Sequence, residues 1–451
     1  MSQPFRRKPI AALMATEDTG HPLKRVLGAG DRVMLAIGAV IGAGIYGAGP
    51  SLVFSFLLLR GACALAALCY AEFASMIPQA GSAYAYCSAT LGQFIAWIVG
   101  WDLILEYAVG NGALAISWSD YFTTLLRGSG LDLPVWLTTG YRTAALSSNP
   151  AVHALVETVP RVLGLPLLVN LPAFGIVLLM TWLLLRGVRE STTANNATVI
   201  VKLLALGLFI AVGLGNVFFA YIGFDALSTP AGETVNPQRN LPIGILGGLA
   251  ICISIYVVVG AVLTGMVAYQ QLAVAGPLAR ALEIAGFTTG GWVVALGAAV
   301  SMAAVLLVFQ YGQPRIFFAM ARDGRLPQWA AQVLRRTRVP YVTTLLTGGL
   351  VSVAAALGDA AETYDLTHIG TLFAFALVCL GVLVLRVVEF VRPRLFRVPV
   401  VWLIAPLGAA ACGFIMIGLP PQAWERFGLW LVAGLVVYGA YGCRHSRLRD
   451  V

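Results

Sequence analysis

The sequence predicts an all-α membrane protein with twelve transmembrane helices. Three observations lead to this prediction. First, 59% of the 451 residues are hydrophobic and only 11% are charged, which is too apolar for a soluble domain. Second, apolar runs recur along the whole chain, many of them long enough to cross a bilayer, which takes about 20 helical residues. Third, Lys and Arg are distributed unevenly among the segments that separate these runs.

Each apolar run is interpreted as one span. The spans are expected at residues 32–46, 50–71, 91–126, 170–187, 194–214, 216–230, 243–268, 290–320, 341–357, 366–388, 399–419 and 426–443. An even number of spans places both termini on one side of the membrane. With the N-terminus in the cytoplasm, 22 Lys and Arg residues are cytoplasmic, five lie outside, and Arg60 and Lys202 remain within spans. This excess predicts cytoplasmic termini.

Several other classes of protein do not fit the sequence. The polar first 31 residues contain no apolar core with a cleavage site, so no signal peptide is expected. The seven cysteines and four histidines have no metal-ligand spacing, so neither a metal nor disulfides are expected. The net charge of +9 is explained by arginine in cytoplasmic loops and does not indicate a nucleic-acid partner. The chain has no phosphate-binding Gly-x-x-x-x-Gly-Lys loop for an ATP-driven pump and no catalytic constellation for an enzyme.

Two spans carry helix-breaking residues. The first contains IGAVIGAGIYGAGP at residues 37–50, and the sixth contains VFFAYIGFDALSTP at 217–230. Glycine in a helix costs about 1 kcal/mol relative to alanine, so such runs need a compensating role. The two spans are five apart and therefore have opposite orientation. Paired broken helices of this kind indicate two inverted repeats with a binding site between them.

The glycine run has two possible roles. Unwound backbone leaves N–H groups for a carboxylate and C=O groups for an ammonium, which together suit a zwitterion, and Gly42 and Gly44 let the ligand approach closely. Alternatively, Gly38 and Gly42 form a Gly-x-x-x-Gly pattern for close helix packing. The spacing alone does not decide between these roles.

Seven segments carry a family resemblance. They are IGAVIGAGI (37–45), CYAEFASMIPQAGSAYAY (69–86), GWDLILEYAVG (100–110), FFAYIGFDA (218–226), NPQRNLPIGI (236–245), RIFFAMARDGRLP (315–327) and IGTLFAFALVCLGVLVLR (369–386). In this order they resemble the cationic amino acid transporter branch of the amino acid–polyamine–organocation superfamily. The resemblance implies a LeuT-like fold of two inverted five-helix repeats plus two C-terminal helices, with spans 1 and 6 discontinuous. The expected division is an N-terminal segment (1–31), the repeats (32–214 and 215–388), two added helices (389–443) and a tail (444–451).

The resemblance also implies the residues that bind the substrate. The substrate carboxylate is expected on the N–H groups of Gly42, Ala43 and Gly44. The amine is expected on carbonyl groups of spans 1 and 6, which belong to Val40, Ile41, Phe219, Ala220 and Ile222. Met302 matches a position that limits the room for the substrate side chain, although by itself it would be read as a lipid-facing or packing residue.

Two charged positions are candidates for proton coupling. Lys202 lies within the fifth span, where a charge costs at least ~2.5 kcal/mol. The resemblance places its ammonium where sodium-coupled relatives bind a cation, whereas the alternative is a lysine that snorkels to the interface. Glu106 and Asp102 are four residues apart and share a helix face. Glu106 matches a family glutamate needed for transport, and it is expected to carry a proton or to hold its helix by a hydrogen bond rather than to contact a cationic substrate.

The remaining charged residues near the spans receive weaker assignments. Asp225 is expected to cap the inner half of span 6 rather than to contact the substrate. Glu72, Arg322 and Asp323 are interpreted as inner-gate or loop-packing residues, with a solvated charge as the alternative. Nothing in the sequence explains Arg60.

The resulting expectation is a secondary transporter of the inner (plasma) membrane that imports L-amino acids with protons. The proton gradient supplies the energy, and no cofactor is expected. The alternatives are an amino acid exchanger without proton coupling and a membrane sensor that does not transport. Family membership suggests basic substrates, whereas Met302 favours small neutral ones. The expected partners are the substrate, the lipid bilayer and, by resemblance, a small single-span subunit.

Two junctions are too short for this fold. Returning from the outer surface to the midplane covers about 15 Å, and an extended residue spans at most ~3.6 Å, so at least about four linking residues are needed. Almost none are present at Tyr46–Gly47 or at Gly215–Asn216. We therefore expect the printed sequence to omit residues at both junctions. A chain that is continuous there would lack a complete outer gate.

Overall fold

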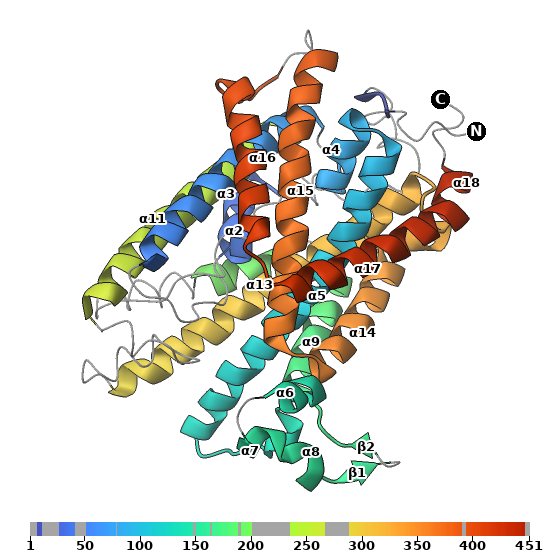
Figure 1. The fold of residues 1–451 in the computed structure, drawn as a ribbon. Helices are drawn as coiled ribbons and strands as arrows, with labels where there is room; N and C mark the ends of the chain where they lie inside the picture. The colour runs from blue at the N-terminus through green and yellow to red at the C-terminus, as the bar shows by residue number, and fades with distance from the viewer. Residues whose placement is uncertain are drawn as a thin grey trace.

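The computed structural model describes residues 7–10, 27–40, 51–77, 79–147, 150–162, 165–187, 191–200, 235–266, 288–389 and 394–446. Within these ranges the chain forms a bundle of long helices (Figure 1). The long helices are α2 (Ala29–Val40), α3 (Ser51–Met76), α5 (Gln93–Gly128), α9 (Leu171–Arg186), α11 (Pro237–Met266), α13 (Thr288–Arg322), α14 (Tyr341–Leu357), α15 (Ala360–Val388), α16 (Val401–Ile417) and α17 (Pro421–Val437). The short helical elements are α4 (Ala83–Thr90), η1 (Val135–Leu137), α6 (Tyr141–Leu146), α7 (Pro150–His153), α8 (Leu155–Thr158), η5 (Gln328–Ala331), η6 (Tyr438–Gly442) and α18 (Cys443–His445).

The long helices follow the predicted spans closely. Ten of the twelve predicted spans overlap one of them, and residues 191–200, at the start of another predicted span, are also helical. The span expected at 216–230 lies outside the described residues. Four described segments are long and apolar enough to cross a membrane, and they are Pro237–Ile255, Leu296–Arg322, Glu362–Val388 and Pro421–His445. Shorter apolar helices are Gly61–Met76, Leu171–Arg186, Tyr341–Leu357 and Val401–Ile417.

Local capping explains where helices begin before the predicted apolar run. Helix α15 starts at Ala360 because Asp359 caps it, with the N–H of Glu362 donating to Asp359 Oδ1 at 3.2 Å. Helix α17 starts at Pro421, a residue whose backbone angle suits the first turn of a helix. Hydropathy alone misses these polar first turns.

Helix α5 is the centre of the bundle. It packs against α13 and α15, and it also contacts α9, α14 and α17. A Cβ atom on Gly100 would lie 2.7 Å from Met320 Sδ, and one on Gly110 would lie 3.1 Å from Phe309 Cε1. These pairs show that α5 and α13 are antiparallel and that glycines allow their close approach, as is common between membrane helices.

The other helices surround this centre. Helix α11 packs on α2 and α3, α14 packs on α9, and α16 packs on α15 and α3. Helix α17 is held to α5 by two tryptophans, because Trp101 Nε1 donates to the carbonyl of Trp430 and Trp430 Nε1 donates to that of Trp101, each at 2.9 Å.

The two ends of the bundle differ. One end, called the loop end below, carries α6, α7, α8 and a small antiparallel hairpin of β1 (Arg161–Val162) and β2 (Leu165–Pro166), all at the bottom of Figure 1. The sequence patterns do not predict this hairpin. At the other end, called the terminal end, the N–H of Lys8 donates to the carbonyl of Ser88 and Ser446 Oγ donates to Gln93 Oε1, each at 2.9 Å. Both ends of the chain therefore approach the same end of the bundle, as an even number of spans requires.

Candidate functional site

Two acidic side chains are buried between α5 and α15. Asp102 is 0% exposed and Glu106 is 1% exposed. Thr371 Oγ1 on α15 donates to Glu106 Oε1 at 2.6 Å. The spacing of four residues predicts that the two carboxyl groups share a face of α5, and the structure places that face against α15. A buried acidic group in a membrane bundle is costly and is therefore a candidate functional residue.

A glycine brings α15 close to these carboxyl groups. A Cβ atom on Gly370 would lie 2.7 Å from Asp102 Oδ1 and 3.4 Å from Glu106 Cβ. A larger residue there would require the Asp102 carboxyl group or one of the helices to shift. Gly370 therefore sets the separation of α5 and α15 at the residue next to Thr371.

Polar groups continue along α5 toward the loop end. The side-chain amides of Asn111 and Gln310 are in direct contact, and Gln310 Nε2 donates to Thr181 Oγ1 at 3.2 Å. Farther along, the hydroxyls of Ser117 and Tyr364 are 2.7 Å apart. These pairs connect α5 with α13, α9 and α15. Helix α5 therefore makes polar contacts with three neighbouring helices over several turns.

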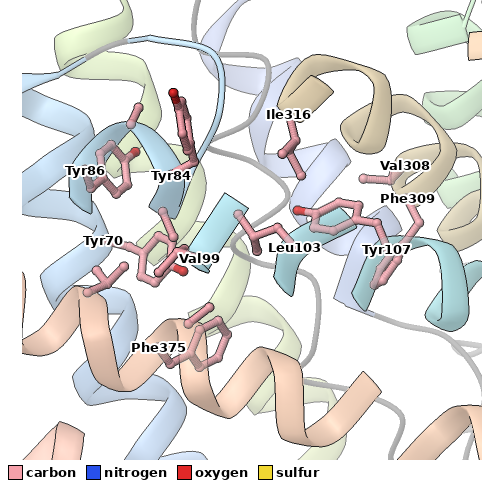
Figure 2. Close-up of a cluster of buried hydrophobic side chains, with 14 of the residues drawn as sticks. Tyr70, Tyr84, Tyr86, Val99, Leu103, Tyr107, Val308, Phe309, Ile316 and Phe375 are labelled. Atoms are coloured by element: carbon pink, nitrogen blue, oxygen red, sulfur yellow. The ribbon is translucent and has the colours of Figure 1, made fainter. Parts of the chain in front are cut away.

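Aromatic side chains also pack between the helices of the bundle. The rings of Tyr107 and Phe309 have centroids 5.3 Å apart, and Figure 2 shows them side by side between α5 and α13. Tyr70 contacts Tyr86 and Phe375 edge to face, with centroids 5.9 and 5.5 Å apart. Aromatic contacts thus join α5 to α13 and α3 to α15.

Met302 is buried in α13 and is 3% exposed. Gln313, farther along the same helix, donates from Nε2 to the carbonyl of Ile104 at 3.1 Å and so marks the level of Asp102 and Glu106. At ~1.5 Å per residue, Met302 lies about 16 Å along α13 from Gln313, toward the loop end. Met302 and Glu106 therefore lie at different depths of the bundle.

An ion-pair cluster closes the terminal end, with Lys8 Nζ 2.6 Å from Asp323 Oδ1 and Tyr84 OH donating to Asp323 Oδ2 at 2.8 Å. The guanidinium of Arg325 lies 5.0 Å from the centroid of the Tyr84 ring. Burial disfavours the charged form of Asp323, but Lys8 and Arg325 outweigh it and hold the pKa of that carboxyl below its ordinary value. Burial raises the pKa of Tyr84 well above its ordinary value, so its hydroxyl stays protonated and donates.

Glu72 contacts a different part of the protein from Asp323, although the sequence suggests the same two roles for both. It accepts hydrogen bonds from Arg386 Nη2 at 2.7 Å, from Arg394 Nη1 at 3.1 Å and from the N–H of Val398 at 2.8 Å. These contacts fasten the segment between α15 and α16 to the end of α3. Glu72 is therefore a loop-packing residue. Arg322 lies with its guanidinium 5.7 Å from the Phe318 ring centroid.

A charged cluster at the loop end was missed by sequence reasoning. Glu362 accepts two hydrogen bonds from Arg142, at 2.7 and 2.8 Å, and one from Arg426 at 2.5 Å. It joins α6, α15 and α17. The partners are 220 and 64 residues away in the chain, so no local pattern could reveal them.

Several predicted site residues fall outside the described residues. These are Ile41, Gly42, Ala43, Gly44, Lys202, Phe219, Ala220, Ile222 and Asp225, together with the junctions Tyr46–Gly47 and Gly215–Asn216. Val40 is the last residue of α2, and Arg60 lies within α3, with the backbone alone described for both. In the ranges that the structure does describe, no group of three or more His, Cys, Asp and Glu side chains forms a metal site.

Comparisons with known proteins give a consistent result. Two Bacillus subtilis proteins match over nearly their whole length: a branched-chain amino acid permease, 40% identical over 99% of both chains, and a methylthioribose transporter, 39% identical over 99% of this chain and 100% of the relative. A vacuolar cationic amino acid transporter of Arabidopsis thaliana is 34% identical over 86% of this chain and 68% of its own length.

The same alignments are longer than this chain. They run over 480 and 478 positions against the Bacillus proteins, more than the 451 residues of this chain, so at least 29 and 27 positions have no counterpart here. The sequence profile of the amino acid permease family matches in two parts, residues 31–217 and 209–438, whose overlap contains the junction Gly215–Asn216. These two matches cover most of the sequence, and the chain therefore belongs to the amino acid permease family.

Proposed function

We propose that the chain is a secondary carrier that imports neutral L-amino acids together with protons by alternating access. The observation that carries the proposal is the buried carboxyl group of Glu106, held by Thr371 between two helices of the bundle core. A carboxyl group in such a place can bind a proton from one side of the membrane and release it to the other. Lys202 is proposed as a second group in this coupling.

The substrate is proposed to bind at the interrupted spans. The residues assigned to it are Val40, Ile41, Gly42, Ala43, Gly44, Phe219, Ala220, Ile222 and Met302. Support comes from the chemistry of free backbone groups toward a zwitterion and from membership of the permease family. The name of the branched-chain amino acid permease supports a neutral substrate over a basic one.

A second candidate substrate is a thiosugar. The methylthioribose transporter is 39% identical, almost the same identity as the amino acid permease, so identity alone does not choose between the two substrates. A thiosugar lacks the carboxylate and ammonium for which the interrupted spans are suited. For this reason we favour the amino acid.

The setting in the cell is also part of the proposal. The carrier is placed in the plasma membrane with both termini in the cytoplasm. The contacts of Lys8 and Ser446 at one end of the bundle support termini on the same side, and the excess of Lys and Arg in the predicted cytoplasmic segments supports that side. A small single-span subunit is proposed as a partner. The natural protein is proposed to contain further residues at the two short junctions, so its intact mass should exceed the 47.7 kDa of the printed sequence.

Uptake into liposomes tests the function. Labelled alanine, leucine, arginine and methylthioribose are each offered to two sets of liposomes. One set has an alkaline interior, and the other has no pH gradient. We expect uptake of alanine and leucine that is driven by the gradient and lost in Glu106→Gln. Uptake that needs an internal amino acid and ignores the gradient would show exchange, and binding without uptake would show a sensor. Gradient-driven uptake of arginine or methylthioribose alone would reject the proposed substrate.

A further inference from the structure

The hydroxyl group of Thr371 lies between a carboxyl group and a backbone carbonyl. Its Oγ1 is 2.6 Å from Glu106 Oε1 and 2.9 Å from the carbonyl oxygen of Thr367 on the same helix. A hydroxyl has one proton and two lone pairs, so it can donate to only one of these oxygens at a time. The direction in which it donates therefore depends on whether Glu106 can itself donate.

The two charge states of Glu106 require opposite directions. An ionised carboxylate only accepts, so Thr371 must donate to Glu106 and leave the Thr367 carbonyl without the hydroxyl proton. A protonated carboxyl can donate to Thr371 Oγ1, and the hydroxyl then donates to Thr367. Both arrangements use the same positions of the three oxygens. The charge on Glu106 is thereby transmitted to the backbone of α15 without a change of rotamer.

The surroundings hold this arrangement in place. Gly370 lets α15 approach α5 so closely that a Cβ there would lie 2.7 Å from Asp102 Oδ1. Other titratable or charged residues lie near Glu106 and Thr371 in the described parts of these helices. They are Asp102 and Tyr107 on α5 and His368 on α15, and the neighbouring helix α13 carries Arg315. Arg315 donates to the carbonyl of Tyr311 at 2.8 Å, within its own helix.

We propose that Thr371 is a positioning residue for Glu106, which orients the carboxyl group in both charge states and couples its protonation to helix α15. The inference rests on the proposed proton coupling but concerns a different residue. Loss of the hydroxyl removes a hydrogen bond from both charge states of Glu106, and the bond to the ionised carboxylate is the stronger of the two. The protonation midpoint of Glu106 should therefore move to higher pH in Thr371→Val, by about one pH unit.

The test measures the protonation of Glu106 directly. Infrared difference spectra of the purified full chain, recorded through a pH titration, follow the carbonyl band of a protonated carboxyl, which is assigned to Glu106 by its loss in Glu106→Gln. We expect the midpoint to move to higher pH in Thr371→Val and to return to the wild-type value in Thr371→Ser. Thr367→Val is the matched control, because that hydroxyl donates to the Thr363 carbonyl at 2.8 Å one turn earlier in the same helix.

Uptake at saturating substrate provides a second readout. Slower proton release should lower kcat of Thr371→Val more than it changes KM, and melting curves confirm that each variant is folded. An unchanged midpoint in Thr371→Val, an equal shift in Thr367→Val, or a Glu106 band that never titrates would overturn the inference. If the Glu106 midpoint shifts as expected but a pH gradient does not drive wild-type uptake, the proposed function fails. The role of Thr371 in positioning the carboxyl group of Glu106 then still stands.

Discussion

Lys8 and Asp323 form a buried salt bridge with 2.6 Å between Nζ and Oδ1, although 315 residues separate them in the chain. The pair joins the N-terminal segment to the residue that follows α13, and Tyr84 completes the contact from α4. Helix α13 packs along α5, the helix that carries Glu106, so this contact lies at the terminal end of a direct neighbour of that helix. Movement of α13 relative to α4 at the terminal end must break it.

Removal of one partner of this pair should destabilise the folded protein strongly. Lys8→Met leaves the carboxylate of Asp323 buried without its cation, which costs about 3 kcal/mol or more. Asp323→Asn should have a similar effect on Lys8. The double variant should cost less than the two single changes together, since neither charge is then left alone. Thermal unfolding of the four proteins measures the coupling, and strictly additive shifts would show that the salt bridge contributes nothing.

The contribution of Asp323 should depend on pH in one direction. The pKa of its carboxyl is lowered in the folded protein by Lys8 and Arg325, which outweigh burial. A lowered pKa stabilises the fold above the ordinary pKa of aspartate, and this stabilisation is lost as the pH falls through the folded value. The difference in unfolding temperature between wild type and Asp323→Asn should be constant from about pH 5 to 7 and shrink below about pH 4. A difference that persists unchanged at pH 3 would contradict this assignment.

Gly370→Ala should disturb the contact between α5 and α15. The added methyl group would lie 2.7 Å from Asp102 Oδ1, so the Asp102 carboxyl group or one helix must shift, at a cost of about 1–3 kcal/mol. Uptake should fall because Thr371 no longer reaches Glu106 in its native position. Gly112→Ala on α5 is the control, since nothing lies within 4 Å of a Cβ there. Equal melting temperatures and equal uptake for the two variants would show that close approach at Gly370 is unimportant.

The cluster at the loop end should order α6 more than it stabilises the whole protein. Glu362→Gln weakens the contacts to Arg142 and Arg426, which are more than a third exposed, so the loss of stability should be under about 1 kcal/mol. Amide hydrogen exchange in α6 should nevertheless become faster. Asp132→Asn breaks the exposed pair with Arg127 at the same end and serves as the control. Unchanged exchange in α6 would mean that Glu362 does not anchor it.

The sequence by itself determined the long helices of the described bundle, because hydropathy acts over one helix at a time. The span expected at 341–357 has the same bounds as α14. The spacing of Asp102 and Glu106 likewise placed two carboxyl groups on one helix face, since a helix repeats every 3.6 residues. The seven ordered segments identified the family, which the comparisons confirmed.

Only the tertiary structure decided what these groups contact. Glu106 meets Thr371, 265 residues later, and Lys8 meets Asp323, because helices distant in the chain pack side by side. The role of Glu72 was settled in the same way, by Arg386 and Arg394 at the end of α15. Differences of a few tenths of an ångström between donor and acceptor decide whether a hydrogen bond forms. Positions that accurate follow from the packing of whole helices rather than from any local pattern of residues.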